Sequence, residues 1–123
     1  MNVSEVRVTP DKYLPFRYAG ASGDFNPIHL DPELAKAVGF PSNILHGLYS
    51  MAQVARCAVQ SAGGDPRRLR RLSVQFRGIG LPEQEIVVSG TVKDESDGRV
   101  VLDLVAEQGD RQIIKNVEAE LGP

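Results

Sequence analysis

The sequence predicts an α+β fold in which an antiparallel sheet wraps around one long helix. Residues 46–62 carry small and apolar side chains at helical spacing, and Arg56 is their only charged residue, a pattern typical of a buried helix. After Pro66 the hydrophobic period changes to that of strands, and we expect about four antiparallel strands there and one strand before the helix. A single-layer sheet on one helix leaves an edge or a face uncovered, so we also expect a dimer.

The chain before the long helix contains helix-start and helix-stop signals. Residues 2–9 are expected to form the first strand because they contain three valines. Residues 9–11 (TPD) combine a hydroxyl cap with a proline at the first helical position, so a helix is expected to start there, short or kinked at Pro15. Asp31 is interpreted as the cap of a second short helix, which Pro32 opens and Gly39 ends.

The strands after the long helix are separated by clear turn signals. The pair Gly63-Gly64 stops the helix, and the dipeptides at 97–98 (DG) and 109–110 (GD) mark hairpin turns. The expected strands cover residues 69–79, 85–92, 100–107 and 112–121.

The stretch 18–32 holds the residues that indicate chemistry. Asp24, Asn26 and His29 lie within six positions, and glycine and proline interrupt regular structure around them, so we expect a shaped loop or a broken helical turn. The second of the two histidines, His46, stands at the start of the long helix. A carboxylate and an imidazole beside a helix N-terminus indicate acid–base chemistry on a carbonyl compound.

Composition limits the other possibilities. The 123 residues fit one domain, expected at 1–123, and a net charge of −2 gives no electrostatic case for nucleic acid or a membrane as a partner. The lone cysteine, Cys57, excludes an internal disulfide and is expected in the core. No apolar run is long enough to span a bilayer, and residues 1–9 lack a secretory signal, so we expect a cytoplasmic protein.

Two motifs make the sequence similar to a known family. Residues 22–32 (SGDFNPIHLDP), followed by residues 44–47 (ILHG), resemble the MaoC-like (R)-specific enoyl-CoA hydratases and dehydratases, and the likeness covers residues 10–80. The resemblance implies the hot-dog fold, a curled sheet around a long helix. Residues 13–18 look like the lead-in to the catalytic half of family members with two hot-dog units. Because only one unit is present here, the resemblance implies pairing with a second copy or with another hot-dog chain.

The resemblance also assigns roles to individual residues. Asp24 and His29 match the catalytic pair, Asn26 the asparagine that helps to hold the site, and Gly47 the glycine whose N–H binds the oxyanion. His46 is a supporting residue by position. The implied reaction hydrates a trans-enoyl thioester to an (R)-hydroxyacyl thioester, or runs in reverse. No cofactor and no metal is expected, since coenzyme A or an acyl carrier protein is part of the substrate.

Other positions are candidates for substrate binding or depart from the family pattern. Ser50, Tyr49 and Arg77 are interpreted as candidates for substrate binding. The family tends towards an apolar-Pro-Gly turn after Phe76, whereas this chain reads GIGLPE at 78–83, so the shape of that side of the tunnel is expected to differ. The basic cluster at 67–71 could meet coenzyme A phosphates or an acidic carrier protein, or could simply be solvated.

Alternative interpretations stay open at this point. Asp24 and Asn26 could form an Asx turn with no chemistry, and Asp24, His29 and His46 have the residue types, although not the spacing, of a metal site. A hot-dog thioesterase would carry a carboxylate on or near its central helix, and residues 46–62 contain none. A non-catalytic hot-dog subunit of a heteromeric dehydratase would be expected to lose the Asp24–His29 pair, and this chain retains both residues.

Overall fold

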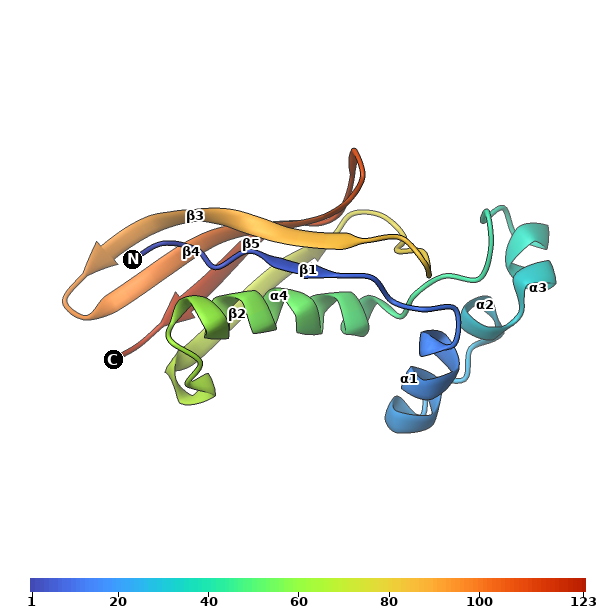
Figure 1. Ribbon diagram of the computed structural model, residues 1–123, viewed down its shortest axis with the longest axis horizontal. Coiled ribbons are helices and arrows are strands. Elements are labelled where there is room, and N and C mark those ends of the chain that lie inside the picture. Colours follow the sequence, from blue (N-terminus) through green and yellow to red (C-terminus); the bar gives the residue numbers. More distant parts are fainter.

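The computed structural model describes all residues, 1–123, and shows a five-stranded antiparallel sheet curled along one helix (Figure 1). The strand order is β1-β3-β4-β5-β2, with every neighbouring pair antiparallel. The elements in chain order are β1 (Val6–Val8), α1 (Leu14–Ser22), α2 (Pro27–Leu30), α3 (Pro32–Ala37), α4 (Gly47–Ser61), η1 (Pro66–Arg68), β2 (Leu69–Phe76), β3 (Ile86–Ser96), β4 (Arg99–Gln108) and β5 (Arg111–Leu121). The predicted α+β class and helix-wrapping sheet are confirmed.

The core lies between α4 and the concave face of the sheet. Val54, Cys57 and Ala58 of α4 are completely buried and pack against side chains of β4 and β5, among them Leu102 and Val117. Removing this apolar area from water supplies the main stabilisation of the fold. The expected core position of Cys57 is confirmed.

One expectation about α4 is wrong for this chain. A helix that is nearly apolar all round was expected to be buried all round, but Leu48, Ala52, Arg56 and Gln60 are exposed. These residues are spaced four apart and therefore form one stripe along the helix. The sheet curls around only one side of α4, which leaves this stripe uncovered.

The hairpins form where the turn signals predicted them. Asp97 and Gly98 both have positive φ, 54° and 77°, and connect the paired residues Ser96 and Arg99. Positive φ at both central residues is the geometry that matches the twist of a two-residue hairpin. In the turn from β4 to β5 only the first central residue, Gly109, has positive φ, at 61°.

The N-terminal boundaries differ from the sequence expectation. The first strand is only three residues long, and α1 begins at Leu14 rather than at the proline–aspartate signal. Asp11 caps the preceding turn instead, accepting a hydrogen bond from the Tyr13 N–H at 2.8 Å. Pro15 falls in the first turn of α1, where a missing N–H costs nothing, and the helix is short, as expected, at nine residues.

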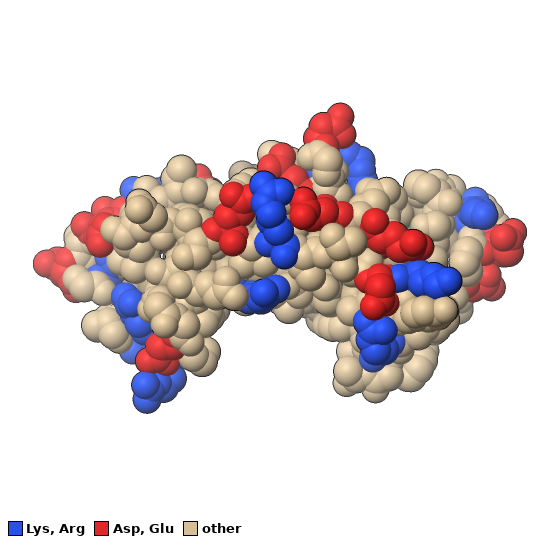
Figure 2. Space-filling view, viewed as in Figure 1, with Lys and Arg blue, Asp and Glu red and all other residues tan.

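Helices α1, α2 and α3 project together from one end of the sheet, beside the N-terminus of α4 (Figure 1). The residues of α1, α2 and α3 therefore lie close to the first turn of α4. Figure 2 shows basic and acidic side chains interspersed over the visible face, without a large field of one sign. No helix of the structure has both the length and the apolar character needed to cross a membrane.

Candidate active site

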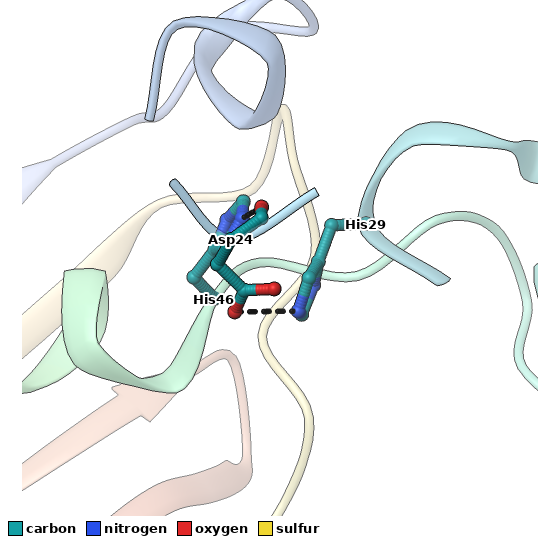
Figure 3. A group of neighbouring side chains, drawn as sticks. All are labelled: Asp24, His29 and His46. Atoms are coloured by element: carbon teal, nitrogen blue, oxygen red, sulfur yellow. Dashed lines mark hydrogen bonds and ion pairs between the residues drawn. The ribbon is translucent and has the colours of Figure 1, made fainter. Parts of the chain in front are cut away.

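Asp24, His29 and His46 come together from three different segments (Figure 3). Asp24 lies in the loop after α1, His29 lies in α2, and His46 immediately precedes α4. Their side-chain nitrogen and carboxylate oxygen atoms all lie within 4.8 Å of one another. The side chains of Asp24 and His29 point towards each other, with 3.6 Å between Asp24 Oδ2 and His29 Nε2.

Local hydrogen bonds shape the loop that presents Asp24. Gly23 ends α1 with φ of 80°, and its N–H donates to the Ala19 carbonyl at 2.8 Å. Asp24 Oδ1 accepts a hydrogen bond from the Asn26 N–H at 3.2 Å, which is an Asx turn. The turn uses only one carboxylate oxygen, so the Asx-turn interpretation and a chemical role for Oδ2 are compatible.

Asn26 and Asp31 act as helix caps. The Asn26 side chain accepts a hydrogen bond from the Ile28 N–H, and Pro27 occupies the first helical position, so α2 starts immediately after Asn26. This start orients the turn that carries His29. Asp31 caps α3 by accepting from Glu33 and Leu34, which confirms its expected role.

The His29 ring is buried and its orientation is fixed by the backbone. Its Nδ1–H donates to the Ile44 carbonyl at 2.9 Å, and the residue is only 7% exposed. A neutral imidazole with its proton on Nδ1 carries a lone pair on Nε2. That lone pair faces Asp24 Oδ2, so two hydrogen-bond acceptors meet across 3.6 Å. One water that donates an O–H to each acceptor satisfies both.

His46 contacts both members of this pair, Asp24 and His29. The His46 Nε2–H donates to the Asp24 main-chain carbonyl at 3.0 Å, and the ring stacks on His29 with 3.9 Å between centroids and 22° between planes. Tyr18 packs on the His46 ring at 4.7 Å. His46 is 2% exposed, and its Nδ1 is buried without a hydrogen-bond partner.

Gly47 follows His46 and is the first residue of α4, so it lies next to the cluster. The N–H groups of a helix's first turn have no partner within the helix, and the helix dipole places partial positive charge there. A Cβ added to Gly47 would lie 3.2 Å from Phe76 Cε1, tighter than ordinary contact. Glycine therefore lets Phe76 close over the helix start.

Two cavities share Gly47 and Phe76 as lining residues. The first, about 330 Å³, is lined additionally by Asp24, His46, Tyr18, Ser22 and Leu48. The second, about 200 Å³, is largely apolar and includes His29, Ser50, Ile44, Ile79, Ile113 and Ile114 among its lining residues. The polar cluster thus stands between a wider opening and a narrower apolar space.

The structure brings only one of the three expected substrate-binding residues to these cavities. Ser50 is 4% exposed and lines the apolar cavity. Tyr49 belongs to the hydrophobic core, where it packs edge-on against Tyr18, and burial raises the pKa of its hydroxyl. Arg77 lines a separate polar cavity with Arg111.

Phe76 is the lining residue whose role sequence reasoning missed. The sequence placed it only within the strand expected over residues 69–79. Its contact with Gly47 joins residues far apart in the chain, and no local signal in the sequence marks that contact.

The basic cluster lies at the other end of α4. Arg68 donates to the carbonyls of Ala62 and Gly122, at 2.9 and 2.8 Å, and Arg67 pairs with Asp65 at 2.9 Å. A helix of 15 residues is about 22 Å long, so these arginines are far from the cluster at its N-terminus. Arg67 and Arg68 therefore make local contacts near the C-terminal end of α4 and lie far from the Asp24–His29–His46 cluster of the same chain.

The histidine stacking also argues against a metal at the Asp24–His29–His46 cluster. A tetrahedral site needs lone pairs that converge on one point. Rings stacked at 3.9 Å between centroids and only 22° from parallel keep their in-plane lone pairs in two separate, nearly parallel planes, so these lone pairs do not converge on one point. The residue types suit a metal, but this arrangement of the rings does not.

Comparison with known proteins agrees with the fold and the motifs. The family described as "MaoC like domain" matches residues 2–113. The chain is 35% identical over 91 residues to "Enoyl-CoA hydratase 2, peroxisomal" of Arabidopsis thaliana. This alignment covers 71% of this chain and 28% of that protein. The crystal structure of a MaoC-like dehydratase from Phytophthora capsici superposes with a TM-score of 0.81 at 30% identity, covering 98% of this chain and 42% of that one.

A further structure, the ChsH1-ChsH2 complex from Mycobacterium tuberculosis, shares the fold with a TM-score of 0.86 at 20% identity, covering 99% of this chain and 94% of that one. A sheet curled around one helix, matching these structures, defines a hot-dog domain. The chain belongs to the MaoC-like domain family. It spans less than a third of the length of the Arabidopsis relative and less than half of the Phytophthora structure.

Proposed function

We propose that this domain catalyses the (R)-specific hydration of trans-enoyl thioesters to (R)-hydroxyacyl thioesters, or the reverse dehydration. The observation that carries the proposal is the pair of facing acceptors, Asp24 Oδ2 and His29 Nε2, 3.6 Å apart. His29 is held in this orientation by its hydrogen bond to Ile44. Such a pair binds one water through both of its protons and leaves the oxygen lone pair free to attack.

The reaction then proceeds with balanced proton transfers. The water oxygen forms a bond to the β-carbon as one water proton passes to the Asp24–His29 pair, and the C=C electrons move towards the thioester carbonyl. The pair returns a proton to the α-carbon, which restores the thioester. Positioned acid–base groups of this kind contribute ~10²–10⁴-fold to the rate.

The start of α4 supports the charge that develops on the thioester oxygen. The Gly47 N–H, with the positive end of the helix behind it, is suited to donate to this oxygen. Loss of such a donor costs on the order of 3 kcal/mol in other enzymes. The glycine itself lets the oxygen approach the backbone closely.

The two cavities suggest how the thioester lies. The apolar cavity, lined by His29 and four isoleucines, would take the acyl chain, and the wider cavity near Tyr18 and Leu48 would take the thiol carrier. The reacting carbons then fall beside Asp24 and His29. We infer fatty acyl thioesters of coenzyme A or of an acyl carrier protein as substrates, without a cofactor or a metal.

We further infer that residues 1–123 act as one MaoC-like unit that pairs with a second hot-dog unit, a copy or a different chain. The exposed stripe along α4 and the exposed aromatic rings of Phe16 and Phe25 support a partner on these surfaces. Size-exclusion chromatography with light scattering tests the pairing, since a monomeric mass for an active protein would refute it.

Two alternatives fit the site less well. A thioesterase with its carboxylate on the central helix is disfavoured because α4 contains no Asp or Glu. A non-catalytic subunit would not need the orientation of His29 towards Asp24.

The direct experiment is a hydratase assay with crotonyl-CoA and longer trans-enoyl-CoA substrates. Loss of the conjugated enoyl thioester absorbance with formation of the (R)-hydroxyacyl product is expected. Release of free coenzyme A without hydration would indicate a thioesterase and contradict the proposal.

A further inference from the structure

We propose that His46 is a positioning residue that fixes Asp24 and His29 relative to each other through a proton held on its Nε2. The expected effect on the reaction rate rests on the proposed function. The tautomers of the two stacked histidines can be measured independently of it. His29 carries its proton on Nδ1 and His46 on Nε2, because each of these nitrogens faces a main-chain carbonyl oxygen.

The hydrogen bond from His46 ties the Asp24 loop to the rest of the fold. The other hydrogen bonds of Asp24 join it to Ser22 and Asn26, each two positions away, and therefore only shape the loop. The bond from His46 Nε2 to the Asp24 carbonyl spans 22 positions. It connects an exposed loop to the residue that precedes the long central helix, so it sets where the Asp24 carboxylate lies.

The same ring fixes the second member of the pair. His46 stacks on His29 at 3.9 Å, and Tyr18 packs against His46, so the plane of the His29 ring is supported by packing. The hydrogen bond to Ile44 fixes the rotation of that ring within its plane. Together these contacts direct His29 Nε2 at Asp24 Oδ2.

The unpartnered nitrogen of His46 shows that packing alone does not explain the residue. Burying an acceptor without a partner lowers stability, and native proteins mostly avoid it. A phenylalanine would fill the same space without that cost. What a histidine adds at this position is the Nε2–H donor. Its Nδ1 is buried, so it is not free to exchange a proton with a bound substrate.

Two variants separate these contributions. His46→Phe keeps a ring for stacking and removes the donor, whereas His46→Gln removes the ring but can place an amide N–H near the former Nε2 position. We expect His46→Phe to lower kcat by roughly 10- to 100-fold with little change in KM, as for a misplaced catalytic group. His46→Gln should recover part of the lost kcat, because it restores the donor but not the ring.

Three kinetic outcomes would overturn the inference. Wild-type kcat in His46→Phe would show that the ring only packs. Equal loss in both variants would show that restoring the donor restores no activity, which contradicts the role given to the Nε2–H. Loss in His46→Gln as large as that from removing His29 would indicate a catalytic rather than a positioning residue. Thermal unfolding of each variant confirms that the measured protein is folded.

A second measurement does not depend on activity. The chain has only two histidines, so long-range ¹H–¹⁵N NMR spectra of the wild-type protein resolve both rings, and the His46→Gln spectrum assigns them. We expect His29 as the Nδ1–H tautomer and His46 as the Nε2–H tautomer. Two rings of the same tautomer would overturn the inference even in an active enzyme. Opposite tautomers in a protein without hydratase activity would support the positioning and refute the proposed function.

Discussion

Gly47 and Phe76 meet at the boundary between the two cavities, where a Cβ at position 47 would lie only 3.2 Å from Phe76 Cε1. The contact joins the first residue of α4 to the last residue of β2. It sets the distance between the proposed oxyanion donor and the ring that, in the proposed binding mode, would separate the thiol carrier from the acyl chain.

Replacing Gly47 with alanine should reduce turnover by moving these two groups apart. The added methyl needs Phe76 or the helix start to shift by a few tenths of an ångström, and misplacing a reacting group costs roughly 10- to 100-fold in kcat. Steady-state kinetics with crotonyl-CoA measure the loss. In a double-mutant cycle, Phe76→Leu should restore part of the activity of Gly47→Ala, and fully additive effects would show that the contact is not responsible.

Shortening Phe76 should change the preference for acyl chain length. Phe76→Ala removes a ring that lines both cavities, so the apolar cavity of about 200 Å³ should open into its neighbour. We expect KM for medium-chain enoyl-CoA substrates to fall relative to that for crotonyl-CoA. Leu48→Ala is a control, since Leu48 lines only the wider of the two cavities; the same shift in both variants would contradict the assignment.

Gln108 should be important for stability because it pairs with the backbone of the loop after β2. It is 2% exposed, accepts from the Leu81 N–H at 2.8 Å and donates to the Leu81 carbonyl at 2.8 Å. Gln108→Leu leaves both groups unpaired and should lower the free energy of unfolding by about 2 kcal/mol or more.

Chemical denaturation measures this loss, with the exposed Gln112→Leu as the matched control. Equal stability of the two variants would show that water or a shifted loop replaces the Gln108 hydrogen bonds.

Cys57 should make the stability of the protein fall in alkaline solution. Burial raises the pKa of the Cys57 thiol, and the thiol also donates to the Ser4 carbonyl. The folded state therefore keeps a proton that the unfolded chain releases above its ordinary thiol pKa of about 8.5, so stability is lost as pH rises from there. The free energy of unfolding between pH 7 and 10 should decline more steeply for wild type than for Cys57→Ala. Parallel curves would contradict the effect.

The elements that could be predicted from the sequence were those with local causes. The helix from 46 to 62 was predicted within one residue at either end because its spacing and its closing glycines are local signals. The hairpin at Asp97 and Gly98 depends in the same way on residues that tolerate positive φ. The start of α1 was placed too early because Thr9 and Pro10 were interpreted as a cap and a first helical residue, whereas a turn capped by Asp11 still precedes the helix at Leu14.

The candidate site was predictable only where it is local. Asp24, Asn26 and His29 lie close in sequence, so their proximity followed from the motif. The directions of Tyr49 and Arg77 did not follow, because they depend on packing and on an irregular strand end. There, the N–H groups of both Arg77 and Gly78 donate to the same Ile113 carbonyl. The hydrogen bond between His46 and Asp24 is likewise a product of the tertiary fold.

The most direct test of the proposed Asp24–His29 pair is to measure kcat for crotonyl-CoA hydration in two conservative variants. Asp24→Asn keeps the shape of the loop without the charge, and His29→Asn can keep a donor for the Ile44 carbonyl while removing the Nε2 acceptor. The account predicts that each folded variant loses ~10²-fold or more in kcat. Wild-type kcat in both folded variants would contradict it.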